Sequence, residues 1–463
     1  MDSSLAKANR KESAIQRRSR WSWYFYDFGN SAYASVILLA VYSVYFKDAV
    51  VGNNAEGTRL WGISVGIAAV AVAVISPVLG AIADFTRFKK KFLFVFTTLS
   101  VVFTALLFFV GKGDVLTGML FFILAEIGYR GAQVFYDALL GDVSTPENIG
   151  SVSGKGWAVG MVGGVVALLV VLAPMQLMEN FNISYAFLIT AAFFTLSAIP
   201  TFLWVKETQI AEQMPEGEKI VFYAFKSIGK TFRAVKSYKE FIKYVVAFLF
   251  YNDGIMILMD FAGIIGGTLF GLEMTQLIIL VVIIQISGAL GALLFGALAD
   301  KRSGKRSVLI SLLMLMIVVS ALFVISSIEG FYVAGYFVSS TIAFFIVGAL
   351  AGLFLSGVQA VSRGIVVQMA PPEKLAEFTG FLSVSGRTST FVGPLVFGTL
   401  AHWMEGWYVD KGFGTEQAEK YGLLWGVGVI LAFLFVGGFI LLFVKQAKAK
   451  ETVEDAPAEE TTV

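Results

Sequence analysis

The sequence contains no cysteine and only one histidine, His402. The absence of cysteine excludes disulfides and thiolate metal sites, and a single histidine cannot build a multi-histidine metal site. We therefore expect neither a metal nor a cofactor. Charge is also scarce, because only 15% of the residues are Asp, Glu, Lys or Arg, whereas soluble domains carry about 25%. Water is therefore not the only solvent of this chain.

Sequence patterns typical of catalysis are missing too. There is no glycine-rich phosphate loop with its lysine, and no nucleophile and base stand at a supporting spacing. The net charge of +2 is not pooled into one basic stripe, so we expect no nucleic-acid partner. The sequence predicts a protein that is not an enzyme and that does not hydrolyse nucleotides itself.

Long apolar runs are what the chain has in abundance. Hydrophobic residues make up 57% of it and the mean hydropathy is +0.78. A helix needs about 20 apolar residues to cross a bilayer core. Twelve such runs are present, six on each side of a polar stretch. They are Tyr24–Phe46, Arg59–Ala83, Phe92–Val110, Val115–Leu140, Gly156–Pro174, Tyr185–Val205, Tyr244–Ile265, Thr275–Ala299, Ser307–Ile325, Tyr336–Arg363, Phe378–Ala401 and Tyr421–Val444.

The distribution of Lys and Arg predicts how the runs are oriented. Most basic residues fall in alternate loops, beginning with the N-terminal segment, which is the positive-inside pattern. We therefore expect an integral protein of the cell membrane with both termini in the cytoplasm. The predicted parts are an N-terminal segment (1–22), a first six-helix bundle (23–205), a linker (206–243), a second bundle (244–444) and a disordered tail (445–463). Ile220–Tyr238 in the linker is expected to form a surface amphipathic helix.

Several short sequences occur twice, once in each half. The stretch Gly80–Lys91 returns as Gly296–Arg306, with Asp84 and Asp300 separated by 300 − 84 = 216 positions. Ser151–Lys155 likewise matches Ser383–Arg387. Since each half has six spans, both halves share one orientation and are related by an axis along the membrane normal. The predicted fold is thus all-α, with two bundles and a binding site near the midplane between them.

Four separated motifs carry a resemblance to a known family. They are YDFGNSAYA at Tyr26–Ala34, VSGKGWAVGMVGG at Val152–Gly164, FYNDG at Phe250–Gly254, and QAVSRG with EFTGF within Gln359–Phe381. With the duplicated basic loop, they resemble the vacuolar effluxer branch of the major facilitator superfamily, which includes the autophagy-related amino-acid effluxer of fungal vacuoles. The chain departs from that pattern at Phe28-Gly29 and Leu140-Gly141. The resemblance implies the major facilitator fold and transport of amino acids.

Charged and polar side chains inside predicted spans are the candidates for transport chemistry. A charge within a bilayer is costly unless it is paired or wetted, so each is a functional candidate by default. The intramembrane charges are Asp27, Glu126, Arg130, Asp137, Asp253, Asp260 and Arg387. From these and their polar neighbours we predict a substrate or ion-coupling site that comprises Asp27, Asn30, Glu126, Arg130, Gln133, Asp137, Asn252 and Asp253.

The fourth predicted helix has the densest set of these groups. Glu126 and Arg130 are four residues apart and share one helix face. They form either a structural ion pair or a site in which Arg130 attracts an anionic group of the substrate. Gln133 and Asp137 extend the same side, which predicts that this helix faces a wet cavity rather than lipid.

The first and seventh helices have carboxylates at comparable positions. Asp27 with Asn30, and Asp253 with Asn252, place polar groups in both halves. Asp27 also lies near a helix start, where a carboxylate offsets the positive end of the helix dipole. Our hypothesis is that Asp253 or Glu126 accepts a coupling proton. Arg387 is either interfacial, like its repeat counterpart Lys155, or a second anion-binding group.

The duplicated loops have a different predicted role. Their charged residues hold the cytoplasmic face and set topology and gating, rather than bind substrate. They are Asp84, Arg87, Lys90, Asp300, Lys301, Arg302, Lys305 and Arg306.

Together these features predict a monomeric secondary transporter. It would move a small polar solute, such as an amino acid, another zwitterion or an organic anion, by alternating access and with a coupling proton or sodium ion. The competing interpretation is a membrane receptor or scaffold that keeps the transporter fold without the transport cycle.

Overall fold

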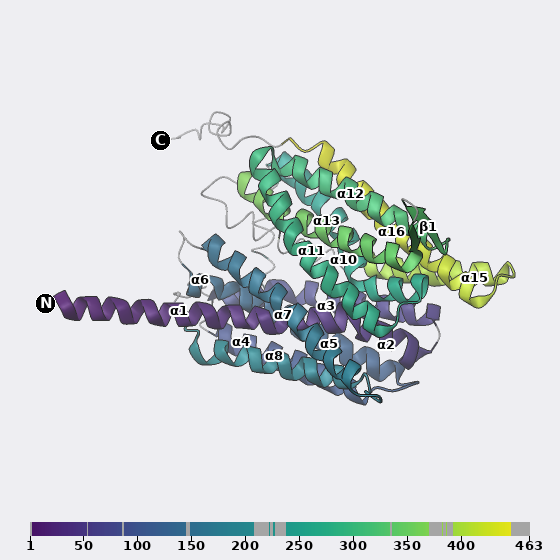
Figure 1. The fold of residues 1–463 in the computed structure, drawn as a ribbon. Coiled ribbons are helices and arrows are strands. Elements are labelled where there is room, and N and C mark those ends of the chain that lie inside the picture. The colour runs from purple at the N-terminus through teal and green to yellow at the C-terminus, as the bar shows by residue number, and fades with distance from the viewer. Residues whose placement is uncertain are drawn as a thin grey trace.

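The computed structural model describes residues 2–52, 54–85, 88–144, 149–207, 238–333, 336–369 and 392–445, besides four isolated positions, 222, 226, 382 and 386. Figure 1 shows two helical bundles, one purple to blue and one green to yellow. The first bundle contains α1 (Asp2–Ala32), η1 (Tyr33–Ala40), α2 (Tyr42–Tyr45), η2 (Phe46–Val51), α3 (Asn54–Phe85), α4 (Lys89–Leu106), η3 (Leu107–Phe109), α5 (Val115–Ala138), α6 (Leu140–Val143), α7 (Ile149–Leu177) and α8 (Tyr185–Trp204).

The second bundle is built in the same way. It contains α10 (Lys239–Phe270), α11 (Met274–Lys301), α12 (Gly304–Ile325), α13 (Ser340–Met369), α15 (Val392–Asp410) and α16 (Thr415–Leu442). An antiparallel hairpin of β1 (Gly330–Val333) and β2 (Tyr336–Ser339) connects α12 to α13. The tenth predicted span therefore begins at Ser340 and not at Tyr336. Apart from this hairpin, the predicted all-α membrane fold is confirmed.

Eleven helices among the described residues are long and apolar enough to cross a membrane. They overlap eleven of the twelve predicted runs. The remaining run, Phe378–Ala401, continues into α15, but its first part lies outside the described residues. The surface helix expected at Ile220–Tyr238 also lies outside the described residues, except for positions 222, 226 and 238. Arg87 and Arg387 lie outside them as well.

The first membrane helix is longer and less regular than its sequence predicts. After α1 it is π-helical in η1 and η2, where the N–H of Val41 donates to the carbonyl of Val36 at 2.8 Å. The predicted end at Phe46 is wrong, because η2 continues to Val51. Short π-helical segments inside helices often mark functional sites.

Corresponding helices have corresponding neighbours in the two bundles. In the first, α1 packs on α7 and α8, while α5 packs on α3 and α4. In the second, α10 packs on α15 and α16, while α13 packs on α11 and α12. When the membrane helices of each half are counted in chain order, the first packs on the fifth and sixth, and the fourth packs on the second and third, in both halves. This is the packing expected of a duplicated six-helix unit.

The two bundles meet at the end of the molecule away from the chain termini, here called the distal end. Trp61 Nε1 on α3 donates to the carbonyl of Asp260 on α10 at 2.9 Å. A Cβ on Gly62 would lie 2.6 Å from the carbonyl oxygen of Pro394 on α15. In Figure 1 the bundles come together on the side of β1 and diverge toward the termini. The distal core is thus shared by both halves.

At the opposite, proximal end, the basic loop residues bond within their own halves. Lys90 Nζ donates to the carbonyl of Val205 at 2.6 Å, and Lys305 Nζ to that of Val444 at 2.6 Å. Lys301, Arg302 and Arg306 are exposed, while Asp84 and Asp300 are the penultimate residues of helices α3 and α11. Each lysine ties a helix start to the last helix of its bundle, and the gating role of these residues stays a prediction.

Two glycines allow helices to approach at backbone distance. A Cβ on Gly163 of α7 would lie 2.1 Å from the carbonyl oxygen of Phe28, and one on Gly291 of α11 would lie 1.9 Å from that of Leu353. We predict that Gly163→Ala or Gly291→Ala destabilises the protein by about 1–3 kcal/mol, because the added methyl meets rigid backbone. The thermal midpoint in detergent measures this.

Gly428 on α16 is the matched control, since a Cβ there meets nothing within 4 Å. Gly428→Ala should raise the midpoint slightly, because alanine favours a helix over glycine by roughly 0.5–1 kcal/mol. Equal effects at all three positions would contradict the packing.

Candidate functional site

An ion pair on α5 lies at the centre of the candidate site. Arg130 Nε donates to Glu126 Oε1, as expected for residues four apart on one helix face. The Glu126 side chain is fully buried, and the Arg130 side chain is 20% exposed. A charge that is paired yet partly open fits a wet cavity better than a lipid-facing surface.

Asp260 brings a second carboxylate to this arginine from the other half. It lies on α10, is 4% exposed, and interacts electrostatically with both Arg130 and Glu126. Two buried carboxylates therefore share one guanidinium across the interface between the bundles. When both acids are ionised, the three groups have a net charge of −1.

The sequence marked Asp260 as an intramembrane charge but did not select it for the site. The choice fell on Asp253, which lies seven residues earlier on the same helix, about 10 Å closer to the proximal end. The position of Asp260 in its helix could have indicated the site, because it comes twenty-one residues after the start of a helix of 32 residues and therefore lies deep in the predicted span. Its nearness to Arg130 is a tertiary fact that no spacing along the chain conveys.

Two stacked tyrosines line the same place. The rings of Tyr33 on η1 and Tyr129 on α5 stack with centroids 4.6 Å apart. The Tyr33 hydroxyl and Glu126 Oε2 are both buried, and Tyr33 interacts directly with the Glu126 carboxylate. Tyr33 therefore belongs to the same polar group as the ion pair.

A further polar group comes from α11. A Cβ on Gly164 of α7 would lie 2.5 Å from both Gln285 Oε1 and Ser35 Oγ. Gln285 Nε2 is buried and makes no hydrogen bond among the described residues. Sequence reasoning missed Ser35 and Gln285, because uncharged polar residues in apolar spans carry little signal by themselves.

Three further residues of the predicted site belong to the first half. Gln133 is hydrogen-bonded with Tyr129 one turn away. Asp27 faces Gly160 on α7, where an added Cβ would lie 2.8 Å from its Oδ2. Asn30 is 3% exposed on the same helix as Asp27. Asp27 and Gln133 both interact with Tyr129 of α5, whereas Asn30 is simply buried on α1.

The remaining predicted residues lie elsewhere. Asn252 and Asp253 are buried within the second half, at 9% and 3% exposure. The carbonyl of Asp253 lies 3.5 Å from a Cβ built on Gly393 of α15. Asp137 is exposed near the proximal end of α5. These positions leave the coupling role of Asp253 a prediction.

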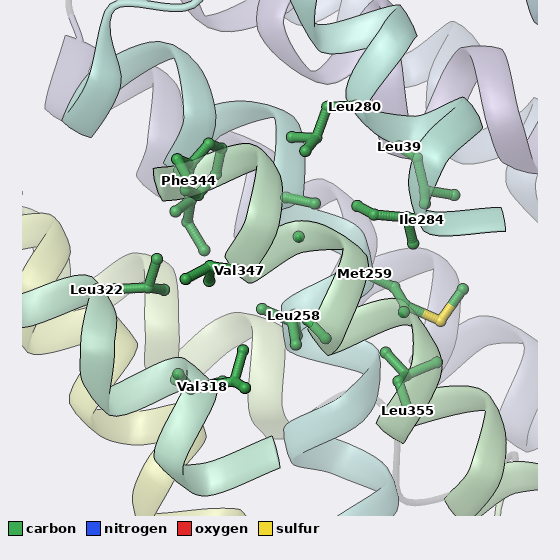
Figure 2. A pocket seen from close by; sticks show the side chains of 16 residues that line it. Leu39, Leu258, Met259, Leu280, Ile284, Val318, Leu322, Phe344, Val347 and Leu355 are labelled. Carbon is green, nitrogen blue, oxygen red and sulfur yellow. The ribbon is translucent and has the colours of Figure 1, made fainter. Parts of the chain in front are cut away.

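An apolar cavity of about 50 Å³ lies mainly among helices of the second half. Figure 2 shows its wall, formed by residues of α10, α11, α12 and α13 together with Leu39 of η1. Met259 lines it and directly precedes Asp260 in the chain, while Ile284 lines it and precedes Gln285. Polar and apolar surfaces therefore alternate along α10 and α11 at the interface.

No group of three or more His, Asp or Glu residues suited to a metal ion occurs in the part of the chain that the structure describes. The site offers instead a guanidinium, two carboxylates, hydroxyls and an amide. Such groups can bind a charged polar solute or a proton.

Comparison with known sequences gives a family. The family described as "Vacuole effluxer Atg22 like" matches residues 49–148 and 142–403. An uncharacterised MFS-type transporter, YxiO of Bacillus subtilis, is 30% identical over 391 residues, which are 82% of this chain and 87% of YxiO. Autophagy-related protein 22-1 of Penicillium rubens is 20% identical over 259 residues, 54% of this chain and 44% of that protein.

Solved structures agree on the fold. A bacterial homologue of the human lysosomal transporter Spinster, inward-facing and unoccupied, has a TM-score of 0.67 at 14% identity, covering 96% of this chain and 99% of its own. The nucleoside transporter NupG also has a TM-score of 0.67 at 14% identity, with coverage of 92% and 99%. The matched family and YxiO are described as an effluxer and a transporter, which confirms the predicted resemblance and the prediction that the chain is not an enzyme.

The buried ion pair yields a stability prediction. Arg130→Met leaves the fully buried Glu126 without its cation, and such a loss costs about 3–5 kcal/mol. Adding Glu126→Gln should restore part of the loss, because the orphaned charge is removed. Thermal unfolding of the two variants in detergent measures the difference. A double variant less stable than Arg130→Met alone would show that Glu126 is not the partner that Arg130 compensates.

Proposed function

We propose that this chain, which belongs to the Atg22-like vacuole effluxer family of the major facilitator superfamily, moves a zwitterionic solute such as an amino acid across its membrane. Membership makes it an integral membrane transporter with a small-molecule substrate. The zwitterion and the coupling proton are the proposal.

The single observation that carries the proposal is Arg130 between two carboxylates from different halves. A guanidinium binds a carboxylate with two parallel hydrogen bonds, and Glu126 and Asp260 can each accept from an ammonium group. An organic anion, the second candidate, would use Arg130 alone and would be repelled by both acids. The paired signs therefore favour a zwitterion.

Charge balance connects the solute to a coupling proton. When the carboxylate of the solute binds Arg130, less of the positive charge of this arginine is left to offset the negative charges of Glu126 and Asp260. An uncompensated carboxylate inside the protein is costly, so one of the two acids would bind a proton. Solute and proton then favour each other, which is the reciprocal coupling that a proton-linked transporter requires. Asp260 thus joins Glu126 as a candidate proton acceptor.

The arrangement of the bundles fits one state of an alternating-access cycle. The halves share a core at the distal end and bond only within themselves at the proximal lysines. With both termini in the cytoplasm, as the positive-inside pattern predicts, this state would be closed to the outside. Rocking the halves about the central charges would expose the site to the other side. We propose the cell membrane as its location and a monomer as its working form.

A receptor or scaffold is the competing function, and flux distinguishes it from transport. Thermal-shift screening of the common amino acids, small peptides and organic acids selects a solute, since a bound ligand raises the midpoint. In liposomes a transporter exchanges that solute across the membrane. Binding without exchange would support the receptor.

Amide variants test the coupling. We predict that Asp260→Asn or Glu126→Gln lowers proton-gradient-driven accumulation of the selected solute by roughly 10-fold or more, an effect of about 1.4 kcal/mol on the driving interaction. Exchange without a gradient should persist in at least one of them, because the amide mimics the protonated acid. Uptake of radiolabelled solute into proteoliposomes measures both rates.

Glu416→Gln is the matched control, because Glu416 is 85% exposed at the start of α16 and pairs only with Lys420 among the described residues. It should leave accumulation unchanged. Full gradient coupling in both Asp260→Asn and Glu126→Gln would remove these acids from the proton step.

A further inference from the structure

A second cluster of buried charges lies at the distal end, away from the central site. Lys47 Nζ on η2 lies 3.0 Å from Glu419 Oε1 on α16. The two side chains are 4% and 7% exposed. Lys47 belongs to the first half and Glu419 to the second, so this ion pair crosses the interface between the bundles.

Close packing holds Lys47 in place. Its Nζ donates to Thr268 Oγ1 on α10, and Thr268 in turn donates to Glu419 Oε1 at 3.3 Å. A Cβ on Gly57 of α3 would lie 2.9 Å from both Cα and Cγ of Lys47. The lysine is therefore enclosed by three elements and directed at the second half.

Glu405 on α15 adds another carboxylate to the cluster. It is 8% exposed and interacts with both Glu419 and Lys47. A Cβ on Gly422 of α16 would lie 3.0 Å from the Cβ of Glu405, so α15 and α16 hold the two acids side by side. Two buried carboxylates share one cation here, as at the central site, but here both acids belong to the second half and the cation to the first.

The remaining charges nearby do not balance this excess. Glu56 on α3 pairs with Arg59 at 2.9 Å and lies 3.7 Å from His402 Nε2. Asp48 lies 3.4 Å from Lys47 Nζ but is half exposed. The titratable or charged residues on the distal parts of the elements that meet here are Lys47, Asp48, Glu56, Arg59, His402, Glu405, Tyr408, Asp410, Lys411, Glu416, Glu419, Lys420 and Tyr421, with none from the distal turns of α10.

We propose that Lys47, Glu405 and Glu419 form a proton-dependent lock that holds the distal gate closed. Lys47 and Glu419 lie in the distal parts of the membrane helices Ala14–Val51 and Thr415–Leu442. Glu405 follows the predicted end of its span at Ala401, on the continuation of α15. Rocking the halves would carry Lys47 away from both carboxylates. The lock therefore forms in the distally closed state and breaks in the distally open one.

Protonation of Glu405 strengthens this lock. Burial, helped by the charge of Glu419 and opposed by Lys47, raises the pKa of Glu405 to about 7. In the open state Glu405 is hydrated and regains a pKa of about 4.3, the ordinary value for a glutamate. Because the closed state holds the proton more tightly, lowering the pH from about 7 toward 4.3 favours closure. Above pH 7 the lock holds two ionised acids and weakens.

The lock also gives the cycle a second proton step. When the distal gate opens at a pH between these two values, Glu405 releases its proton to the distal side. That proton is separate from any proton bound by Glu126 or Asp260. With both termini in the cytoplasm, the distal side faces the outside of the cell. The external pH then acts on Glu405 at the distal end as well as on Glu126 and Asp260 at the central site.

The natural absence of cysteine allows a direct distance measurement on the full chain. Spin labels at Lys112→Cys and Asp410→Cys mark exposed distal positions on the two halves. Double electron–electron resonance in nanodiscs reports the separation between the labels from pH 8 to pH 5.5. We expect the ratio of short to long distances to begin to rise near pH 7 and to increase on the order of 10-fold by pH 5.5.

Variants of the lock assign the pH response to its residues. Glu405→Gln mimics the protonated acid, so the short distance should dominate at every pH. Lys47→Met should reduce the short distance at pH 5.5, while the exposed Glu416→Gln should titrate like the parent. A parent distance that does not change with pH, or a Glu405→Gln protein that titrates like the parent, would overturn the proposal. This readout needs no solute, so it does not depend on the proposed substrate.

Discussion

The need to compensate buried charge governs the polar parts of this structure. At the centre, Arg130 stands between Glu126 and Asp260, and at the distal gate Lys47 stands beside Glu405 and Glu419. In both places the cation belongs to the first half, and the second half supplies at least one acid. Moving the halves therefore changes which charges are paired, and each surplus carboxylate gives a proton or a solute ammonium group a place to bind. Few other interactions in an apolar bundle can make conformation depend on protonation so strongly.

The apolar fold positions these groups with little freedom. Helix pairs repeat between the bundles, and at Gly163 and Gly291 the backbones approach too closely for any side chain. The shared distal core joins the bundles on one side of the central charges. The π-helical course of η1 places Tyr33 and Ser35 beside α5 and α7. Rigid halves with a charged seam between them are what alternating access requires.

The sequence predicted the spans because about 20 apolar residues in succession have few other uses. It predicted the Glu126–Arg130 pair because a spacing of four places side chains on one helix face. Asp260 was not selected, because its partner lies 130 residues earlier in the chain, in the other half. Lys47, Glu405 and Glu419 went unnoticed because they fall just beyond the apolar runs, where charge is ordinary. Local periodicity thus predicts elements and pairs within one helix, whereas the contacts between halves need the folded structure.

The central claim is that Arg130 and Asp260 act together across the interface between the halves. A double-mutant cycle of Arg130→Gln and Asp260→Asn tests it, with the exchange rate of the solute selected by thermal shift as the readout. If the residues interact, the combined loss in rate will be smaller than the product of the single losses, with a coupling of about 0.5–3 kcal/mol. Independent losses, whose free energies simply add, would contradict the account.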